Sequence, residues 1–455
     1  MATRGLLSNS DSLLWRIGSD PLLRSPILVV ALLDRRPSEA RFRATLERAC
    51  EALPQLRTRL VEPPLGIGRP AWEDDEQFSL DHHVRREHLT TGGLRAVLDL
   101  AERDAVTAFD PARPLWMVDL VDGPNETNAL VLRLHHAMID GIAGIQMAER
   151  IFDRSRTVRG AARSTEPGRA AATPDGQHGV QAAAATFGRA VAGAAGRAAA
   201  ATIRDPVSSV TSPLAFARSA ARMLAPAPPA GSRLLTGRGL DRRLHTFRVR
   251  LAGLRATAYR AGGTVNDVLL AAVAGAVDAY HRELGSPIAA ARVTMPINIR
   301  RPGDPEGGNR FTPARFALPV DDPDPIARIR IAHAIVRSWR DEPAVAGTPV
   351  LAAGLNLLPK PVVTRVFGGL LRSQDVNVSN VPGLVRPAYV GGARIERLAA
   401  FAPPTGAAFS VTLVSHGEDC EVAVMCDTAA VDQPDRMGQL VESGLADMVQ
   451  VGARP

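Results

Sequence analysis

The alternation of hydrophobic and polar positions predicts a first half, residues 1–153, that mixes helices and strands. Ile27–Leu33 is a run of β-branched residues and leucines, which is typical of a buried strand. A helical pattern follows from Ser38, where apolar residues recur at helical spacing. Ala129–Leu134 predicts a further strand, and Ile142–Phe152 predicts a helix with one apolar face.

The periodicity stops after Phe152 and resumes near residue 233. Residues 154–232 are rich in Ala, Arg and Pro, and we predict that they form a crossover linker that is partly helical. In the second half, residues 233–455, Thr264 begins a strong helical pattern and Phe409–Ser415 predicts a strand. Helices and strands follow one another without strict βαβ order or a short repeat, which predicts a mixed α/β fold.

Composition and charge narrow the class of protein without identifying it. With 45% hydrophobic and 22% charged residues, the chain has the composition of a globular protein and is not intrinsically disordered as a whole. The net charge is +7, and basic residues do not cluster with aromatic ones, so we expect no nucleic-acid partner. Three cysteines without a C-x-x-C pair provide no disulfide framework, which is typical of a reducing cytoplasm.

The sequence gives no sign of a secretory signal or a membrane span. The first residues lack the apolar core of a signal peptide. The longest apolar runs, Ile27–Leu33 and Val268–Val277, are far shorter than the roughly 20 residues that a spanning helix needs. We therefore expect a cytoplasmic protein that can lie on a membrane but does not cross one.

The segment from Leu132 to Gly141 carries the residues best suited to chemistry. The predicted strand ends in His135 and His136, and a short turn with Asp140 and Gly141 leads into the next helix. Because side chains alternate along a strand, His136 shares a face with the leucines of this strand, whereas His135 points to the opposite face. An imidazole titrates near neutral pH and is the usual general base in enzymes.

These residues allow three interpretations. Both histidines could be packed core residues, with Asp140 as the N-cap of the following helix. Two histidines and an aspartate could also supply three ligands to a metal ion. The opposite side-chain directions, and the lack of a further cluster of His, Cys or Glu, argue against a metal site. The third interpretation is a general-base centre for acyl transfer.

The full string HHAMIDG, residues 135–141, fits the HHxxxDG signature of the acyl-CoA-dependent acyltransferase superfamily. Five further segments, in the expected order, resemble the bacterial wax ester synthase/diacylglycerol acyltransferase family along nearly the whole chain. They are LSNSDSLLW, PLW at residues 114–116, TVNDVLLAAVAGAV, MPINIRRPGD followed by GNRFTP, and SNVPG followed by YVGGA. The departures are minor: Phe109 replaces a more usual leucine, and residues 154–232 resemble nothing definite.

The resemblance implies both a fold and a reaction. Members of the superfamily have two halves of the chloramphenicol acetyltransferase type, with mixed sheets and a substrate channel between them. A fatty acyl-CoA donates its acyl group to a hydroxyl of diacylglycerol, which gives triacylglycerol, or of a long-chain alcohol, which gives a wax ester. Acyl-CoA is a co-substrate, and the resemblance implies no separate cofactor and no metal.

The resemblance also assigns roles to individual residues. His136 carries over as the general base, and His135, Asp140 and Asn266 complete the predicted catalytic group. Asp140 would shape the turn or orient an imidazole. Asn266 could donate a hydrogen bond to the oxyanion that develops during acyl transfer.

Further motif residues are predicted to contact substrate, and each also has a structural explanation. Asp267 fits a capping box at the start of its helix, and Trp116 fits core packing. Gly141 permits a tight turn. Arg300 and Arg301 could bind the phosphates of CoA, although arginine is common throughout this chain and favours the solvated surface.

Both acceptors partition into lipid, so we expect peripheral contact with the inner face of the plasma membrane or with lipid droplets. The arginines of Gln181–Arg222 are the candidate contact with anionic lipid. Two alternatives remain. One is an acyltransferase of the same superfamily that uses a polyketide diol or a carrier-bound acceptor, and the other is a non-catalytic, lipid-binding relative.

Overall fold

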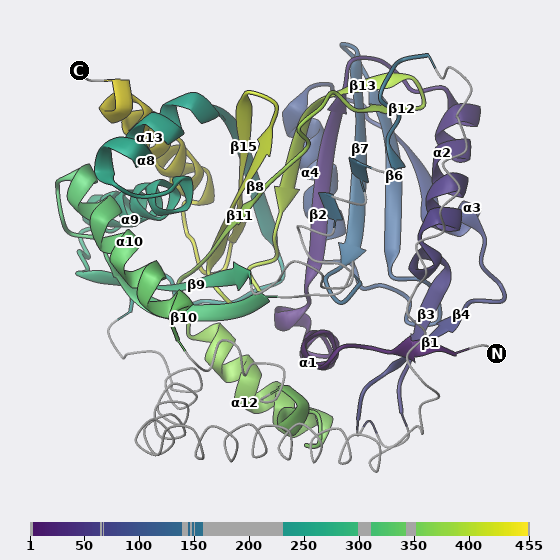
Figure 1. Ribbon diagram of the computed structural model, residues 1–455, viewed down its shortest axis with the longest axis horizontal. Coiled ribbons are helices and arrows are strands. Elements are labelled where there is room, and N and C mark those ends of the chain that lie inside the picture. Colours follow the sequence, from purple (N-terminus) through teal and green to yellow (C-terminus); the bar gives the residue numbers. More distant parts are fainter. Residues whose placement is uncertain are drawn as a thin grey trace, which may run out of the picture.

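Two six-stranded mixed sheets stand side by side and form the body of the molecule (Figure 1). The computed structural model describes residues 3–63, 66, 68–138, 144–145, 148–149, 151–157, 231–298, 311–342 and 352–453. The mixed α/β architecture predicted from the sequence is confirmed. In this part of the chain no helix is long and apolar enough to cross a membrane.

The first sheet is built around two antiparallel central strands. In spatial order it contains β12 (Tyr389–Val390), β13 (Ala393–Phe401), β2 (Pro26–Leu33), β7 (Thr127–His135), β6 (Trp116–Gly123) and β5 (Val84–His88). The apolar run at residues 27–33 and the strand predicted at residues 129–134 are β2 and β7, which pair from Pro26 opposite His135 to Leu32 opposite Ala129. This register fixes the position at which β7 delivers its two histidines.

The second sheet mixes parallel and antiparallel pairs around β11. Its spatial order is β10 (Phe311–Pro319), β9 (Ala290–Asn298), β11 (Val376–Val381), β14 (Phe409–His416), β15 (Asp419–Asp427) and β8 (Arg242–Arg250). Strand β11 runs parallel to both β9 and β14. Gly417 joins β14 to β15 at a φ of 62°, a left-handed conformation that favours glycine. A small third sheet contains β1 (Thr3–Leu6), β4 (Ala71–Asp74) and β3 (Thr58–Val61).

The second half of the chain contributes two strands to the first sheet. Strand β13 pairs with β2, with Phe401 opposite Leu28, and β12 pairs with β13 at the sheet edge. Strand β13 also lies against β14 and β15 of the second sheet. The chain therefore leaves the second sheet after β11, adds an edge to the first and returns at β14. The first sheet contains strands from both halves of the sequence, whereas all six strands of the second sheet come from the second half.

Helices surround the two sheets, and α4 lies between them, in contact with β8 of the second sheet and with β2 and β7 of the first (Figure 1). Those of the first half are α1 (Asn9–Ile17), α2 (Glu39–Ala52), α3 (Leu80–His83) and α4 (Leu94–Ala105). Those of the second half are α8 (Leu251–Ala261), α9 (Val265–Glu283), α10 (Pro325–Arg340), α12 (Lys360–Arg372) and α13 (Pro434–Ala453). Short 3₁₀ helices span Pro21–Leu23 and Pro54–Arg57.

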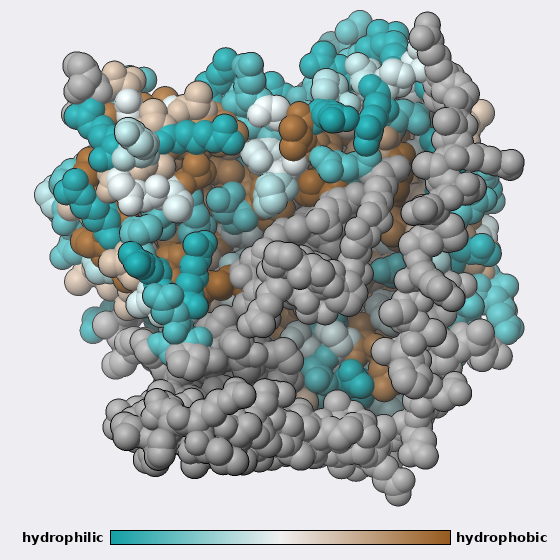
Figure 2. All heavy atoms as spheres, viewed as in Figure 1, coloured by the Kyte–Doolittle hydropathy of each residue, from teal (hydrophilic) through white to brown (hydrophobic). Residues whose placement is uncertain are grey.

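Helix α9 is the central helix of the second half. It packs against α8, α10 and α13, and every residue from Asp267 to Ala274 is buried. Its apolar surface extends around the whole helix, which is the pattern of a helix enclosed by others. In the view of Figure 2, hydrophilic side chains cover most of the described surface, and hydrophobic ones show between them.

Most of the predicted linker, residues 158–230, lies outside the described residues, and so does the candidate lipid contact at Gln181–Arg222. The helix predicted over residues 142–152 is described in part, and Gly144, Ile145, Ala148 and Glu149 are helical.

Candidate active site

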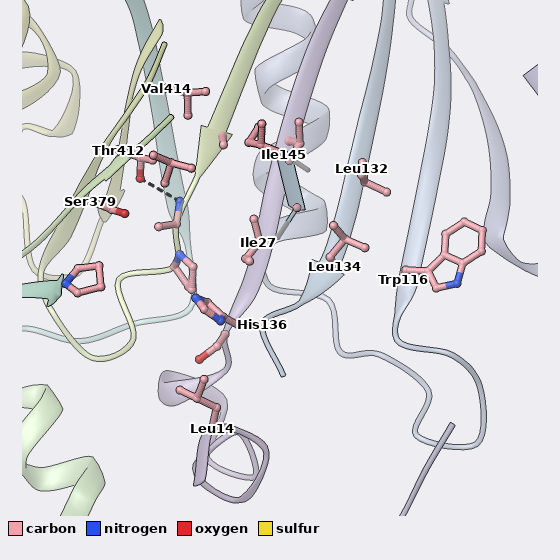
Figure 3. Close-up of a pocket in the computed structure, with 18 of the residues that line it drawn as sticks. Leu14, Ile27, Trp116, Leu132, Leu134, His136, Ile145, Ser379, Thr412 and Val414 are labelled. Carbon is pink, nitrogen blue, oxygen red and sulfur yellow. Dashed lines mark hydrogen bonds between the residues drawn. The ribbon is translucent and has the colours of Figure 1, made fainter. Parts of the chain in front are cut away.

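A cavity of about 400 Å³ lies between the two sheets, and both halves of the chain line it. On one side it meets β2, β6 and β7 together with α2, and on the other it meets β9, β10, β11 and β14. Figure 3 shows these two walls facing each other, with Ile27, Leu132 and Leu134 on one side and Ser379, Thr412 and Val414 on the other.

The wall that the first sheet provides is apolar, and its side chains form rows across the strands. Ile27 of β2 lies opposite Leu134 of β7, and Leu134 lies opposite Trp116 of β6. The next row along the strands is made by Val29, Leu132 and Val118. Because alternate residues of a strand share a face, all of these side chains point to the cavity. Such a surface suits a long hydrocarbon chain.

His136 lies at the end of this apolar wall and faces the cavity. It follows the last residue of β7, and its backbone N–H donates to the carbonyl of Ser25 at 2.9 Å. Figure 3 shows His136 between Leu14 of α1 and Ile27 of β2. Its Nδ1 atom is buried. The expectation that His136 shares a face with Leu130, Leu132 and Leu134 is met, because all four line the cavity.

His135 points away from the cavity, as the strand alternation predicts. Its Nδ1 accepts a hydrogen bond from the backbone N–H of Ala137 at 3.1 Å, which fixes the turn after β7 and places the ring proton on Nε2. The rings of Trp15 and Phe109 meet it edge-on, with centroids 5.5 and 6.1 Å away. Burial, and then the charge of His136, lowers the pKa of His135 to about 3.

The inclusion of His135 in the catalytic group stays a prediction. His135 does not line the cavity, and its pKa is lowered chiefly by burial. In the structure its Nδ1 bonds to the turn that carries His136.

A buried cluster of charges lies on the same side of β7 as His135. Arg133 donates through Nη1 to the carbonyls of Asp104 and Thr107, at 3.0 and 2.6 Å, and its guanidinium lies 4.6 Å from the ring centroid of Phe109. The carboxylates of Asp104 and Asp119 both accept hydrogen bonds from the guanidinium of Arg85. Burial, followed by the neighbouring Asp104 carboxyl, raises the pKa of Asp119.

The structure gives Asp267 the capping role. Its Oδ2 accepts hydrogen bonds from the backbone N–H of Thr264 at 2.8 Å and from Nδ1 of His333 at 2.9 Å, and Thr264 completes the capping box of α9. Asp267 does not line the cavity, so its predicted contact with substrate is not found there. The amide of Asn266 donates to Sδ of Met295 at 3.3 Å, and Asn266 does not line the cavity either.

Trp116 combines both roles considered for it. Its side chain lines the cavity, yet it is almost fully buried and donates from Nε1 to the carbonyl of Leu56 at 2.8 Å. The ring of His83 stacks on it with a centroid distance of 4.4 Å. Its orientation is therefore fixed by its neighbours before any substrate enters.

Several predicted site residues lie outside the described part of the chain, namely Asp140, Gly141, Arg300 and Arg301. Among the described residues no group of three or more His, Cys, Asp or Glu is placed to hold a metal ion. Cys50, Cys420 and Cys426 are free and buried, and burial raises the pKa of each thiol. A thiolate nucleophile is therefore a poor candidate at these positions.

The sequence did not single out three polar residues of the second sheet that line the cavity, Thr294, Arg315 and Asn377. The sequence signal for Arg315 was weak. Arg315 follows the segment GNRFTP by two residues, but it lies outside that motif. These three residues come together only through the pairing of their strands, which a sequence motif does not reveal.

The fold and the site together define the class of protein. The first condensation domain of the CDA synthetase superposes over 100% of this chain and 97% of its own, with a TM-score of 0.61 and 16% identity. The wax ester synthase/diacylglycerol acyltransferase of Marinobacter aquaeolei VT8 superposes over 99% of this chain and 100% of its own, with a TM-score of 0.62 and 21% identity. The chain thus has the two-domain condensation-type fold, with a histidine at the cavity between the halves.

Sequence comparison narrows this class to one family. Residues 7–269 match the wax ester synthase/diacylglycerol acyltransferase catalytic domain, and residues 307–449 match the C-terminal domain of the same family. A protein of Mycobacterium tuberculosis strain H37Rv, provisionally named a diacylglycerol O-acyltransferase, is 36% identical over 98% of this chain and 92% of its own length. The chain belongs to the wax ester synthase/diacylglycerol acyltransferase family, as the sequence motifs indicated.

Proposed function

We propose that the protein transfers a fatty acyl group from acyl-CoA to the hydroxyl of diacylglycerol or of a long-chain alcohol. The observation that carries this proposal is the position of His136 at the end of an apolar wall inside the inter-sheet cavity. A fatty chain laid on that wall brings its reactive end to an imidazole. The name of the Mycobacterium tuberculosis relative supports a diacylglycerol acceptor, and that of the Marinobacter protein supports both acceptors.

In this proposal His136 is the general base and then the general acid. Its imidazole takes the proton of the acceptor hydroxyl while the oxygen attacks the thioester carbonyl. The tetrahedral intermediate collapses with cleavage of the carbon–sulfur bond, and the imidazolium returns the proton to the thiolate of CoA. The products are an ester and free CoA, and no covalent acyl-enzyme is required. Since Nδ1 of His136 is buried, Nε2 is the nitrogen assigned to the substrate proton.

The reaction as proposed requires acyl-CoA as a co-substrate and no further cofactor. Both kinds of acceptor are lipids, so the enzyme would meet them at a membrane or lipid-droplet surface. We infer peripheral association with such a surface on the cytoplasmic side.

The test is a CoA-release assay with His136→Ala, in which the lipid products are also identified. We expect the variant to fold and to lose about 10²- to 10⁴-fold in turnover, the usual contribution of a general acid–base group. His82→Ala is the matched control, because His82 is an exposed histidine of the same half. Release of CoA by folded His136→Ala at the wild-type rate, with acceptor present, would refute the assignment of the base.

A further inference from the structure

The wall of the cavity opposite the apolar one carries a polar row that crosses three strands. Arg315 of β10 lies directly opposite Thr294 of β9, and Thr294 lies beside Asn377 of β11 in the parallel register. All three side chains line the cavity. Because residues paired across neighbouring strands share a face, Arg315, Thr294 and Asn377 form one continuous row, which we call the polar row.

Two members of the polar row have hydrogen-bonding atoms that the described residues leave unused. Thr294 is 8% exposed, and its hydroxyl has no hydrogen-bond partner among these residues. Asn377 donates from Nδ2 to the carbonyl of Pro403 at 3.2 Å, but its Oδ1 is buried and has no partner in the same part of the chain. Buried polar groups are normally satisfied, so such atoms at a cavity wall indicate a polar ligand.

Arg315 gives the polar row its electrostatic character. Its guanidinium lines a cavity whose other wall is hydrocarbon, and burial lowers its pKa. Arginine nevertheless remains protonated in proteins and carries donors in a rigid fork. The row therefore combines the positive charge of Arg315 with a donor from Thr294 and an acceptor from Asn377.

The neighbouring row on the same wall does not share this character. It is made of two cross-strand pairs that line the cavity, Pro313 with Pro296 and Ser379 with Thr412. Two of its members are prolines, and the hydroxyl oxygen of Thr412 already accepts a hydrogen bond from the backbone N–H of Ala402 at 3.2 Å (Figure 3). The unsatisfied polar atoms are thus concentrated in one row rather than spread over the wall.

We propose that the polar row binds the ester and hydroxyl groups of an acylglycerol acceptor and selects it over a simple 1-alkanol. Ester carbonyls can accept from Arg315 and Thr294, and a glycerol hydroxyl can donate to Asn377. A 1-alkanol presents one hydroxyl and a hydrocarbon chain, so it can bond to fewer of these groups. This inference rests on the proposed acyl transfer and assigns its acceptor specificity to residues of β9, β10 and β11.

The amides of the pantetheine arm of CoA present similar carbonyl and N–H groups. The experiment must therefore distinguish binding of the acylglycerol from binding of CoA. We would measure kcat/KM for dioleoylglycerol and for hexadecanol at a fixed acyl-CoA concentration, and the KM for acyl-CoA with each acceptor. The variants are Thr294→Val, which is nearly isosteric, and Arg315→Met, which keeps the length of the side chain. Thr428→Val is the matched control, because Thr428 is an exposed threonine outside the cavity.

For both variants we expect kcat/KM with dioleoylglycerol to fall about 5- to 30-fold, the usual effect of losing a hydrogen bond in a buried site. With hexadecanol, kcat/KM of both variants should equal that of the wild type. The KM for acyl-CoA should not change. Equal losses with both acceptors, together with a higher KM for acyl-CoA, would assign the polar row to CoA and overturn the proposal. Unchanged acceptor preference in Thr294→Val would overturn it as well, even if Arg315→Met fails to fold.

A binding measurement separates this inference from the proposed function. Titration of the wild type and Thr294→Val with dihexanoylglycerol by calorimetry, without acyl-CoA, requires no turnover. Weaker binding to the variant supports the polar row even if the wild type shows no acyl transfer, in which case the proposed function alone fails. Equal binding to both proteins rejects the polar row as the acylglycerol site.

Discussion

Replacement of His135 by asparagine should make the protein less sensitive to acid. In the native state His135 is neutral, because burial lowers its pKa to about 3, whereas a histidine in an unfolded chain has a pKa of about 6.5. A depressed native pKa provides stability that is fully present above about pH 6.5 and is lost as the pH falls toward about 3. Between these values, unfolding is favoured because only the unfolded chain takes up the proton.

The size of the effect follows from the two pKa values. Each pH unit within the window costs about 1.4 kcal/mol in the free energy of unfolding. For native and unfolded pKa values of about 3 and 6.5, the loss between pH 8 and pH 5 is about 2 kcal/mol. Asparagine has no proton to take up in this range, and its Oδ1 can replace Nδ1 as the acceptor for the N–H of Ala137.

The assay is urea unfolding of the wild type and His135→Asn at pH 8 and at pH 5. We expect the variant to lose about 2 kcal/mol less than the wild type over this interval. His83, which is also buried and has a pKa lowered to about 4 chiefly by burial, remains in both proteins and cancels in the comparison. His82→Asn controls for the removal of an exposed histidine. If His135→Asn and the wild type lose the same stability, His135 is not a buried neutral residue and the reasoning is wrong.

Two further predictions concern other buried groups. Because the native pKa of Asp119 is raised, its contribution to stability is present at low pH and is lost as the pH rises from about 4 toward 7. Asp119→Asn should therefore reduce this loss of unfolding free energy by up to about 1.4 kcal/mol per pH unit. The same urea unfolding series measures the effect. Gly383→Ala should destabilise the protein, because an added Cβ would overlap the carbonyl oxygen of Ser415; an unchanged melting temperature would show that the backbone relaxes there without cost.

Local features of the sequence predicted local structure well. The alternation along β7 correctly separated His135 from His136, because the two-residue period of a strand does not depend on its partners. Asp267 was identified as a capping residue from the spacing of three residues alone, and the structure contains that capping box. In both cases the information needed lies within one turn or one strand of the chain.

Features that depend on distant pairing could not be predicted in the same way. The sequence of residues 389–401 does not indicate that β12 and β13 pair with the sheet of the first half. The hydrophobic pattern of such a strand is the same whichever sheet it joins. The polar row is a similar case. Arg315, Thr294 and Asn377 lie far apart in the sequence, and only the registers of β10, β9 and β11 align them.

Strand β13 also connects the two sheets beside the cavity, because it pairs with the first sheet and contacts the second. Arg397 of β13 donates from Nε to both carboxylate oxygens of Glu421 on β15, at 3.1 and 3.2 Å, and this carboxylate is 3% exposed. Just beyond β13, the carbonyl of Ala402 accepts from the hydroxyl of Ser410 on β14 at 2.6 Å. These bonds tie a strand of the first sheet to two strands of the second beside the cavity. Strand β13 and the residue after it therefore connect the sheet that provides the apolar wall to the sheet that carries the polar row.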